Sequence, residues 1–230
     1  MNGDLANAMI VDGASFVLSK FHGNQCVEVG SSNLRGDIQA GGSPASTLVG
    51  DRYMQSVRFN GVAEYAIINS ATTAITMSDP MSIVFWINYE DIGVDNHDVI
   101  EFGSDTNGFR IILDGANLVD PRVVTRVTVS SVATNRQTGN QEYLKPGITS
   151  MVALVLDTSA ITFYIDGQTS NSSSSGVPIA NVATSTMYLG RRKQVANPDY
   201  MSGSVGPVAV FPSALTQAQI INQMNLGKGI

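Results

Sequence analysis

Short apolar runs alternate with polar residues along most of the chain after its first fifty positions, and turn-forming residues separate them. Val57 and Phe59 alternate with polar neighbours before Asn60-Gly61, and Tyr65–Ile68 follows. Because side chains of a strand point to opposite faces in turn, this spacing predicts strands with one buried face. Asn-Gly pairs are typical of tight turns. About ten to twelve such strands are expected, a number typical of an antiparallel β-sandwich.

One apolar run, Met81–Asn88, is nearly continuous and rich in β-branched and aromatic residues. This pattern predicts a central strand that is buried on both faces. Trp86, the only tryptophan, lies within it, so we expect its ring in the core rather than on a sugar-stacking surface. Met151–Ile165 contains two apolar runs around a polar turn and predicts a hairpin, whereas the serine-rich Asn171–Gly176 predicts a loop.

A helix is expected near the end of the chain. Thr216 can cap its first turn, and Gln219, three residues later, can complete a capping box. Leu215 and Ile220 flank the cap at the spacing of a hydrophobic staple. Gly227 is a natural stop for such a helix.

The first fifty residues show a weaker pattern. Phe16–Leu18 and Cys26–Val29 are candidates for short strands, and Leu34–Gly50 is rich in Gly, Ser, Ala and Pro. Such a composition predicts a loop or an extended arm. An arm that packs on a neighbouring subunit and a long first loop of the same domain are both compatible with it. We therefore divide the chain into an N-terminal segment, 1–50, and a β domain, 51–230.

The composition narrows the function classes. Charged residues make up 14% of the 230 residues, and the net charge is −6, so binding to nucleic acid is not expected. A single cysteine, Cys26, excludes an intrachain disulfide. The first residues lack a basic and apolar leader pattern, and no long apolar run is present. We therefore expect neither a signal peptide nor a membrane span.

Six segments follow one another in an order that resembles a known group. The chain is similar to the laminin-G-like, or concanavalin A-like, lectin/glucanase superfamily, in the jelly-roll variety common in bacterial and phage surface proteins. The resemblance implies an all-β, antiparallel jelly-roll sandwich with one short C-terminal helix. The segments are VRFNGVAEYAII, MSIVFWIN, GFRIILDG, MVALVLDTSAITFYIDG, MYLGRR and SVGPVAVFPSALTQAQI.

The chain departs from this family where relatives often carry acidic residues. Asn60 stands at a position that is often Asp, Ala63-Glu64 replaces an acidic pair, and Gly206-Pro207 replaces another acidic position. Since such residues contribute to calcium binding in some relatives, these differences weaken the case for the family's own metal site.

Calcium remains a candidate at two other loops. This ion prefers several oxygen ligands from carboxylates, amides and carbonyls, and both loops lie beside predicted strand ends. Asp and Asn are also common loop residues for reasons of backbone conformation alone. The candidate metal ligands are Asp95, Asp98 and Asp105.

Carbohydrate binding needs planar hydrogen-bonding side chains together with an aromatic ring. Each candidate taken alone is also compatible with an ordinary surface residue. The candidate ligand-binding residues are Tyr89, Asn96, His97, Asn107, Tyr143, Arg191 and Tyr200.

Catalysis is not expected. Glycoside hydrolysis requires two carboxylates that flank the scissile bond, and the chain's five glutamates do not form the Glu-x-Asp-x-x-Glu pattern of the glucanases. A Gly-x-Ser-x-Gly nucleophile motif is also missing.

These features predict a non-enzymatic virion protein, either a capsid decoration or a fibre or tail component of a phage. Its lectin-like domain would bind host glycans. The expected partners are other virion proteins, further copies of the chain and cell-surface glycans. A carbohydrate-binding module of a bacterial surface protein is the alternative hypothesis. A multimer held by residues 1–50 would favour the virion protein.

Overall fold

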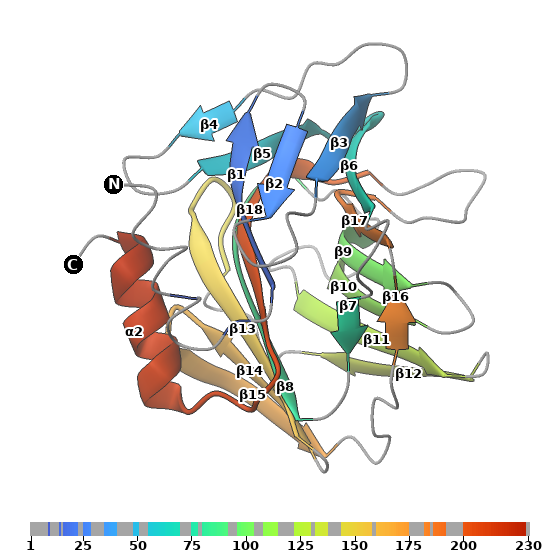
Figure 1. Ribbon diagram of the computed structural model, residues 1–230. Coiled ribbons are helices and arrows are strands. Elements are labelled where there is room, and N and C mark those ends of the chain that lie inside the picture. The colour runs from blue at the N-terminus through green and yellow to red at the C-terminus, as the bar shows by residue number, and fades with distance from the viewer. Residues whose placement is uncertain are drawn as a thin grey trace.

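Strands of an antiparallel sandwich dominate the computed structural model (Figure 1). It describes residues 9, 14, 16–22, 25–28, 35–40, 48–50, 55–69, 75–77, 80–91, 96–103, 108–114, 122–129, 132–137, 144–157, 160–174, 182–184, 186–191 and 200–228.

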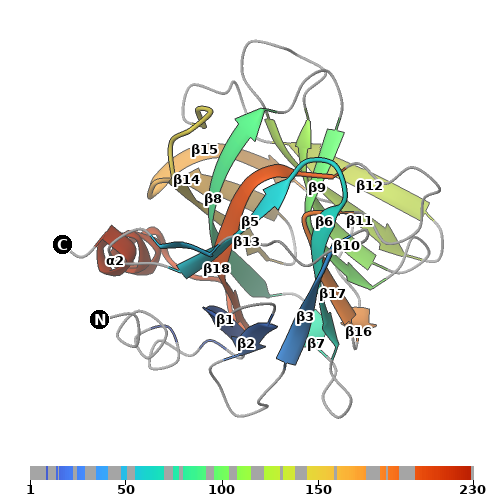
Figure 2. The same ribbon diagram turned by 90° about the horizontal axis from the view of Figure 1, so that it is seen from above.

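The sandwich has two layers, which Figure 2 shows from above. The helix-side layer runs in the order β5-β18-β8-β13-β14-β15, and the far layer runs β6-β17-β9-β10-β11-β12. The helix-side strands are β5 (Gln55–Asn60), β8 (Met81–Asp91), β13 (Ser150–Leu156), β14 (Ala160–Ile165), β15 (Gln168–Ser174) and β18 (Ser202–Phe211). The far-layer strands are β6 (Glu64–Asn69), β9 (Asn96–Gly103), β10 (Gly108–Asp114), β11 (Arg122–Val129), β12 (Val132–Gln137) and β17 (Thr186–Leu189).

Three N-terminal strands join the layers into one continuous hydrogen-bonded sheet. β1 (Phe16–His22) pairs with β18, β2 (Gln25–Glu28) pairs with β1, and β3 (Arg35–Ala40) pairs with both β2 and β6. Two further short pairs are β4 (Leu48–Gly50) with β5, and β7 (Ile75–Met77) with β16 (Val182–Thr184). The stretch expected to be a loop or an arm thus contains two strands, and the sheet does not begin at residue 51.

The core between the layers is apolar and completely buried. It includes Ile83, Phe85 and Ile87 from β8 and Ile100 and Phe102 from β9. Strand β8 lies between β18 and β13 and is buried along most of its length, as the continuous apolar run predicts.

A second apolar cluster lies on the outer side of β8, β13 and β18. There helix α2 (Gln217–Lys228) runs along the outside of this layer (Figure 1). Its buried Ile220 belongs to one apolar cluster with Trp86, Met151 and Phe211. Trp86 is 2% exposed, so its predicted place in the core is confirmed. Gly227 lies inside α2 instead of ending it. A glycine is needed at this position because the helix backbone lies against the Trp86 ring. A Cβ added there would lie 2.5 Å from Cζ2 of Trp86.

The start of α2 has the predicted capping box. The Thr216 backbone N–H donates to Gln219 Oε1 over 2.9 Å, and the Gln219 N–H donates to Thr216 Oγ1 over 3.4 Å. Leu215 and Ile220 are both buried in the apolar cluster under the helix.

One local prediction is confirmed and another needs correction. The predicted Asn60-Gly61 turn forms; it carries the chain from one layer to the other, and β5 and β6 do not pair. Asn60 Oδ1 accepts from the backbone N–H groups of Val62 and Ala63, which stabilises this turn without a hairpin. The segment Asn171–Gly176 is a strand as far as Ser174, because β15 pairs with β14 along its length.

Candidate functional site

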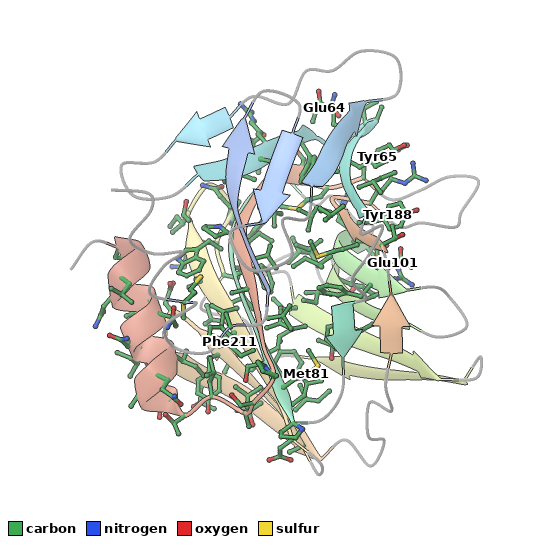
Figure 3. The ribbon with its side chains drawn as sticks, in the orientation of Figure 1. Glu64, Tyr65, Met81, Glu101, Tyr188 and Phe211 are labelled. Carbon is green, nitrogen blue, oxygen red and sulfur yellow. The ribbon has the colours of Figure 1, made fainter. Side chains whose placement is uncertain are left out.

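The outer face of the far layer carries aromatic and charged side chains. On β6 and β17, Ala66, Ile68, Met187 and Leu189 face the core, so the alternating residues Tyr65 and Tyr188 face outward. Figure 3 shows Tyr65, Tyr188 and Glu101 on this outer side of the ribbon.

The register across the layer brings Tyr188 beside ionisable groups. Tyr188 of β17 lies opposite Glu101 of β9, and Glu101 lies opposite Arg110 of β10. Side chains at directly opposite positions of antiparallel strands are close enough to interact. One row across three strands therefore holds an aromatic residue, an acid and a base.

Arg191, just beyond β17, packs on Tyr65. Its Cζ lies 4.1 Å from the centre of the Tyr65 ring, a cation–π geometry. The Tyr200 ring lies 6.3 Å from the Tyr65 ring, centre to centre, with a tilt of 37°. We name Tyr65, Tyr188, Arg191 and Tyr200 the tyrosine–arginine cluster. All four side chains are half-buried, so they are held in place and still reach solvent.

Backbone hydrogen bonds at Gly190 fix this arrangement. The Gly190 N–H donates to the Val99 carbonyl over 3.0 Å, and the Gly190 carbonyl accepts from the Met201 N–H over 2.9 Å. Gly190 has φ of 77°, and an added Cβ would lie 2.8 Å from the Phe59 ring. Only glycine suits this position. The bonds hold Arg191 and Tyr200 next to each other although nine positions separate them in the chain.

A buried ion pair lies on the neighbouring strands. Arg110 Nε donates to Asp98 Oδ1, and Arg110 Nη2 donates to Asp98 Oδ2, both over 2.8 Å. Asp98 is fully buried and Arg110 is 6% exposed. A two-pronged pair of this kind has a fixed geometry, so it orders the part of the layer beside the cluster.

The environment raises the pKa of the Tyr188 hydroxyl above the ordinary value. Burial is the main cause of the raised pKa. The charges of Glu101 and Tyr65 raise this pKa further, whereas the charge of the Arg191 guanidinium lowers it. Tyr188 therefore keeps its proton, and with it a hydrogen-bond donor, at every physiological pH.

The structure brings three of the residues predicted to bind a ligand close together. Arg191 and Tyr200 belong to the tyrosine–arginine cluster, and His97 Nδ1 donates to the Tyr200 carbonyl oxygen. Asn96 is exposed at the start of β9. Tyr89 is elsewhere: its ring lies in the core and its hydroxyl donates to the Leu144 carbonyl over 3.3 Å. Asn107 and Tyr143 lie outside the described residues.

The predicted calcium site stays a prediction. Of its three candidate ligands, Asp98 is engaged by Arg110, and Asp95 and Asp105 lie outside the described residues. Within the described ranges, no group of three or more His, Cys, Asp or Glu side chains is arranged to hold a metal ion.

Tyr65 and Tyr188 are site residues that the sequence reasoning did not select. Their signal is the alternation on β6 and β17, where a tyrosine occupies an outward position on each strand. A large ring on the outer side of a strand, next to a Gly-Arg turn, is the pattern that would have found them.

None of the described helices is long and apolar enough to cross a membrane.

A family model, described as the concanavalin A-like lectin/glucanases superfamily, matches residues 60–221. The chain belongs to this superfamily. No curated protein matches the sequence significantly. The jelly-roll fold of this lectin-type family is the one that the order of the sequence segments predicts.

Solved structures of botulinum neurotoxin domains share the superfamily fold. The ligand-binding domain of serotype D, in complex with N-acetylneuraminic acid, is 13% identical with a TM-score of 0.70. That similarity covers 96% of this chain and 52% of the toxin chain. A structure of type C, whose cell entry depends on two ganglioside molecules, is 14% identical with a TM-score of 0.69 and covers 96% and 53%.

A third toxin structure is the binding domain of type DC in complex with rat synaptotagmin II. It is 11% identical, with a TM-score of 0.70, over 94% of this chain and 52% of the toxin chain. The chain thus spans about half the length of these toxin domains. At such low identity the likeness establishes the fold alone.

Proposed function

We propose that this protein is a non-enzymatic carbohydrate-binding domain and that the tyrosine–arginine cluster is its binding surface. The observation that carries the proposal is the Arg191 guanidinium packed on Tyr65, with two further tyrosine rings beside it. Aromatic rings provide flat apolar surface for the C–H face of a sugar, and Tyr and Arg donate hydrogen bonds to its hydroxyl groups.

The serotype D ligand-binding domain is in complex with N-acetylneuraminic acid, and the cell entry of type C depends on two ganglioside molecules. The present chain matches only half of each, so the sugar binding of those proteins is not by itself a property of the matched half. The sugars named for those toxin domains make sialylated and neutral animal glycans the first probes to test.

The burial of the nearby carboxylates supports a binding role over hydrolysis. A glycosidase needs two carboxyl groups in contact with the substrate. On this face, Asp98 and Glu101 are both 0% exposed, and Asp98 is bound by Arg110. These acids are therefore placed to order the sheet rather than to reach a scissile bond.

We further propose that the domain belongs to the surface of a phage particle, as a capsid decoration or a fibre or tail component. Support comes from the low share of charged residues and from a sequence without cysteine pairs. Light scattering of the intact chain tests this setting, since a particle component of this kind is expected to form a defined homo-oligomer. A strict monomer would contradict it.

A glycan array tests the binding proposal directly. We expect the wild-type protein to bind a subset of glycans, and Tyr188→Ala and Tyr200→Ala each to weaken binding by about tenfold, because each removes stacking area and a hydroxyl. Tyr164→Ala is the matched control, because Tyr164 is a half-buried tyrosine that packs against the apolar cluster under α2. Equal losses in all three variants, or no binding to any glycan, would refute the proposal.

A further inference from the structure

We propose that Glu64 adds an amine-binding point to the carbohydrate surface, so that the preferred ligand is a glycan with a free amino group. Such a glycan contains an amino sugar without its acetyl group, in the positively charged ammonium form. This inference rests on the proposed function and adds the chemical class of the ligand. It follows from the burial, bonding and position of Glu64, the residue before Tyr65 of the tyrosine–arginine cluster.

Glu64 is a buried acid at the start of β6. The residue is 6% exposed, and its backbone N–H donates to Asn60 Oδ1 over 3.3 Å. Within the described part of the chain, no group forms a hydrogen bond or an ion pair with its carboxylate. Asp98, by contrast, has both carboxylate oxygens held by Arg110. Since burying an unpaired carboxylate lowers stability, Glu64 has a binding capacity that the packing of the described residues does not use.

The Glu64 carboxylate lies where a ligand on the cluster can reach it. Ala66 and Ile68 of β6 face the core, so Glu64 continues their row and Tyr65 faces outward. Because Glu64 is the first residue of β6, it lies at the end of the strand, and Figure 3 shows it at the same end of the ribbon as Tyr65. Val62, in the preceding turn, is 73% exposed. A glycan stacked on Tyr65 therefore reaches Glu64 by passing over the strand end.

The groups around Glu64 suit an amine better than a metal ion. Calcium prefers several oxygen ligands, and in the described ranges Glu64 belongs to no group of three or more His, Cys, Asp or Glu side chains. Asn60 Oδ1 already accepts from the N–H groups of Val62, Ala63 and Glu64. A single carboxylate carries one negative charge, which one ammonium group balances. The N–H donors of that group form short, charge-assisted hydrogen bonds to the carboxylate oxygens.

The charge of the whole chain also favours a positively charged ligand. The sequence has 19 Asp and Glu against 13 Lys and Arg, which gives a net charge of −6. The field of an acidic protein attracts cations before contact. At contact, the buried position of Glu64 strengthens the attraction, because less water lies between the two charges than at an exposed site.

The experiment compares glycans that differ in the amine alone. Titration calorimetry would measure the dissociation constants of the glucosamine trisaccharide, of its N-acetylated form and of the diamine cadaverine with the wild-type protein. We expect the glucosamine trisaccharide to bind at least about tenfold more tightly than the acetylated form, since a charge-assisted hydrogen bond contributes that much. Cadaverine should bind far more weakly than either, because it has no sugar ring to stack on tyrosine.

Two variants assign the preference to Glu64. Glu64→Gln should reduce the difference between the two trisaccharides to less than about twofold. Glu90→Gln is the matched control, because it removes the same charge from an exposed acid of β8, one that pairs with Arg58 over 2.6 Å. It should keep the preference. Loss of the preference in both variants would assign it to the net charge of the chain and overturn the role of Glu64.

Stability in the absence of glycan is an independent readout. Glu64→Gln removes a buried charge that has no partner among the described residues, so it should melt at the same temperature as wild type or higher. A clearly lower melting temperature would mean that the carboxylate stabilises the fold, and it would overturn the proposal. Calcium that raises the melting temperature of wild type but not of Glu64→Gln would identify a metal ion as the partner and would overturn it as well.

The remaining outcomes separate the two proposals. Equal affinity for the two trisaccharides, lost in Tyr188→Ala, would overturn the amine ligand and support the carbohydrate site. A preference that survives in Glu64→Gln would overturn the role of Glu64, and cadaverine binding as tight as that of the glucosamine trisaccharide would overturn the glycan as its source. If neither trisaccharide bound while the array showed other glycans, only the amine ligand would fail. If the array were also blank, both proposals would fail.

Discussion

The two outer faces of the sandwich are built from the same kind of strand and differ in what they carry. The outer side of β8, β13 and β18 is apolar, with Trp86 at its centre, and α2 covers it. The outer side of β6, β17 and β9 carries tyrosines, an arginine and an acid. Both faces lie over one continuous core.

This contrast shows which face is structural. An apolar sheet face must be covered to be stable in water, and α2 provides that cover through Leu215 and Ile220. A face of aromatic and polar groups can stay partly solvated, so the residues on it need not serve stability. Substitutions on the helix-covered face should therefore act on folding, and substitutions in the tyrosine–arginine cluster should act on binding.

The largest expected effect tests that division. Trp86→Ala should lower the free energy of unfolding by about 3–5 kcal/mol, because it leaves a cavity under α2. Tyr188→Ala, on the other face, should cost about 1 kcal/mol. Urea unfolding followed by far-UV circular dichroism measures both. Similar losses in the two variants would remove the contrast, and Trp86→Phe serves as a folded reference if Trp86→Ala does not fold.

The buried pair on the far layer should give the next largest effect. Asp98→Ala leaves Arg110 charged and buried, so a loss of about 3 kcal/mol in unfolding free energy is expected. Glu90→Ala removes the partner of the exposed Arg58 and should cost less than about 1 kcal/mol. Chemical denaturation of both variants gives the comparison. An Asp98 variant as stable as the Glu90 variant would mean that the pair does not order the layer.

The smallest effect concerns pH. Since the folded protein raises the pKa of Tyr188 above 10.0, the unfolded chain gives up this proton first. The stability due to the neutral hydroxyl is complete below pH 10 and is lost as the pH rises through the higher folded pKa. Tyr188→Phe should therefore lose less stability than wild type as the pH rises above about 10. Parallel slopes in denaturation measured across that range would contradict this.

Sequence reasoning predicted the fold best where local chemistry and packing agree. The run around Ile83–Ile87 is apolar on both sides because the core lies on one side and α2 on the other. The Thr216–Gln219 capping box is a local motif, so its residues alone specify it. The hairpin of β13 and β14 likewise depends on neighbouring residues, with Asp157 Oδ1 bound to the Ala160 N–H.

What sequence reasoning missed depends on distant partners. Arg35–Ala40 has little strand character of its own and becomes β3 because β2 and β6 pair with it. The turn at Asn60-Gly61 was predicted, but its residues do not reveal that β5 pairs with the distant β18. In the candidate site, Arg191 and Tyr200 were selected for their chemistry, whereas Tyr65 lies beside Arg191 because β6 pairs with β17, a strand that is distant in the sequence.

The position of β18 has a consequence for synthesis on the ribosome. β18 pairs with β1, β5 and β8, three strands that are translated well before it. Until residues 202–211 leave the ribosomal exit tunnel, β8 lacks one of its two neighbouring strands and the helix-side layer is incomplete. Folding of the helix-side layer therefore waits for β18, and a nascent chain stalled before residue 200 is the form most exposed to aggregation.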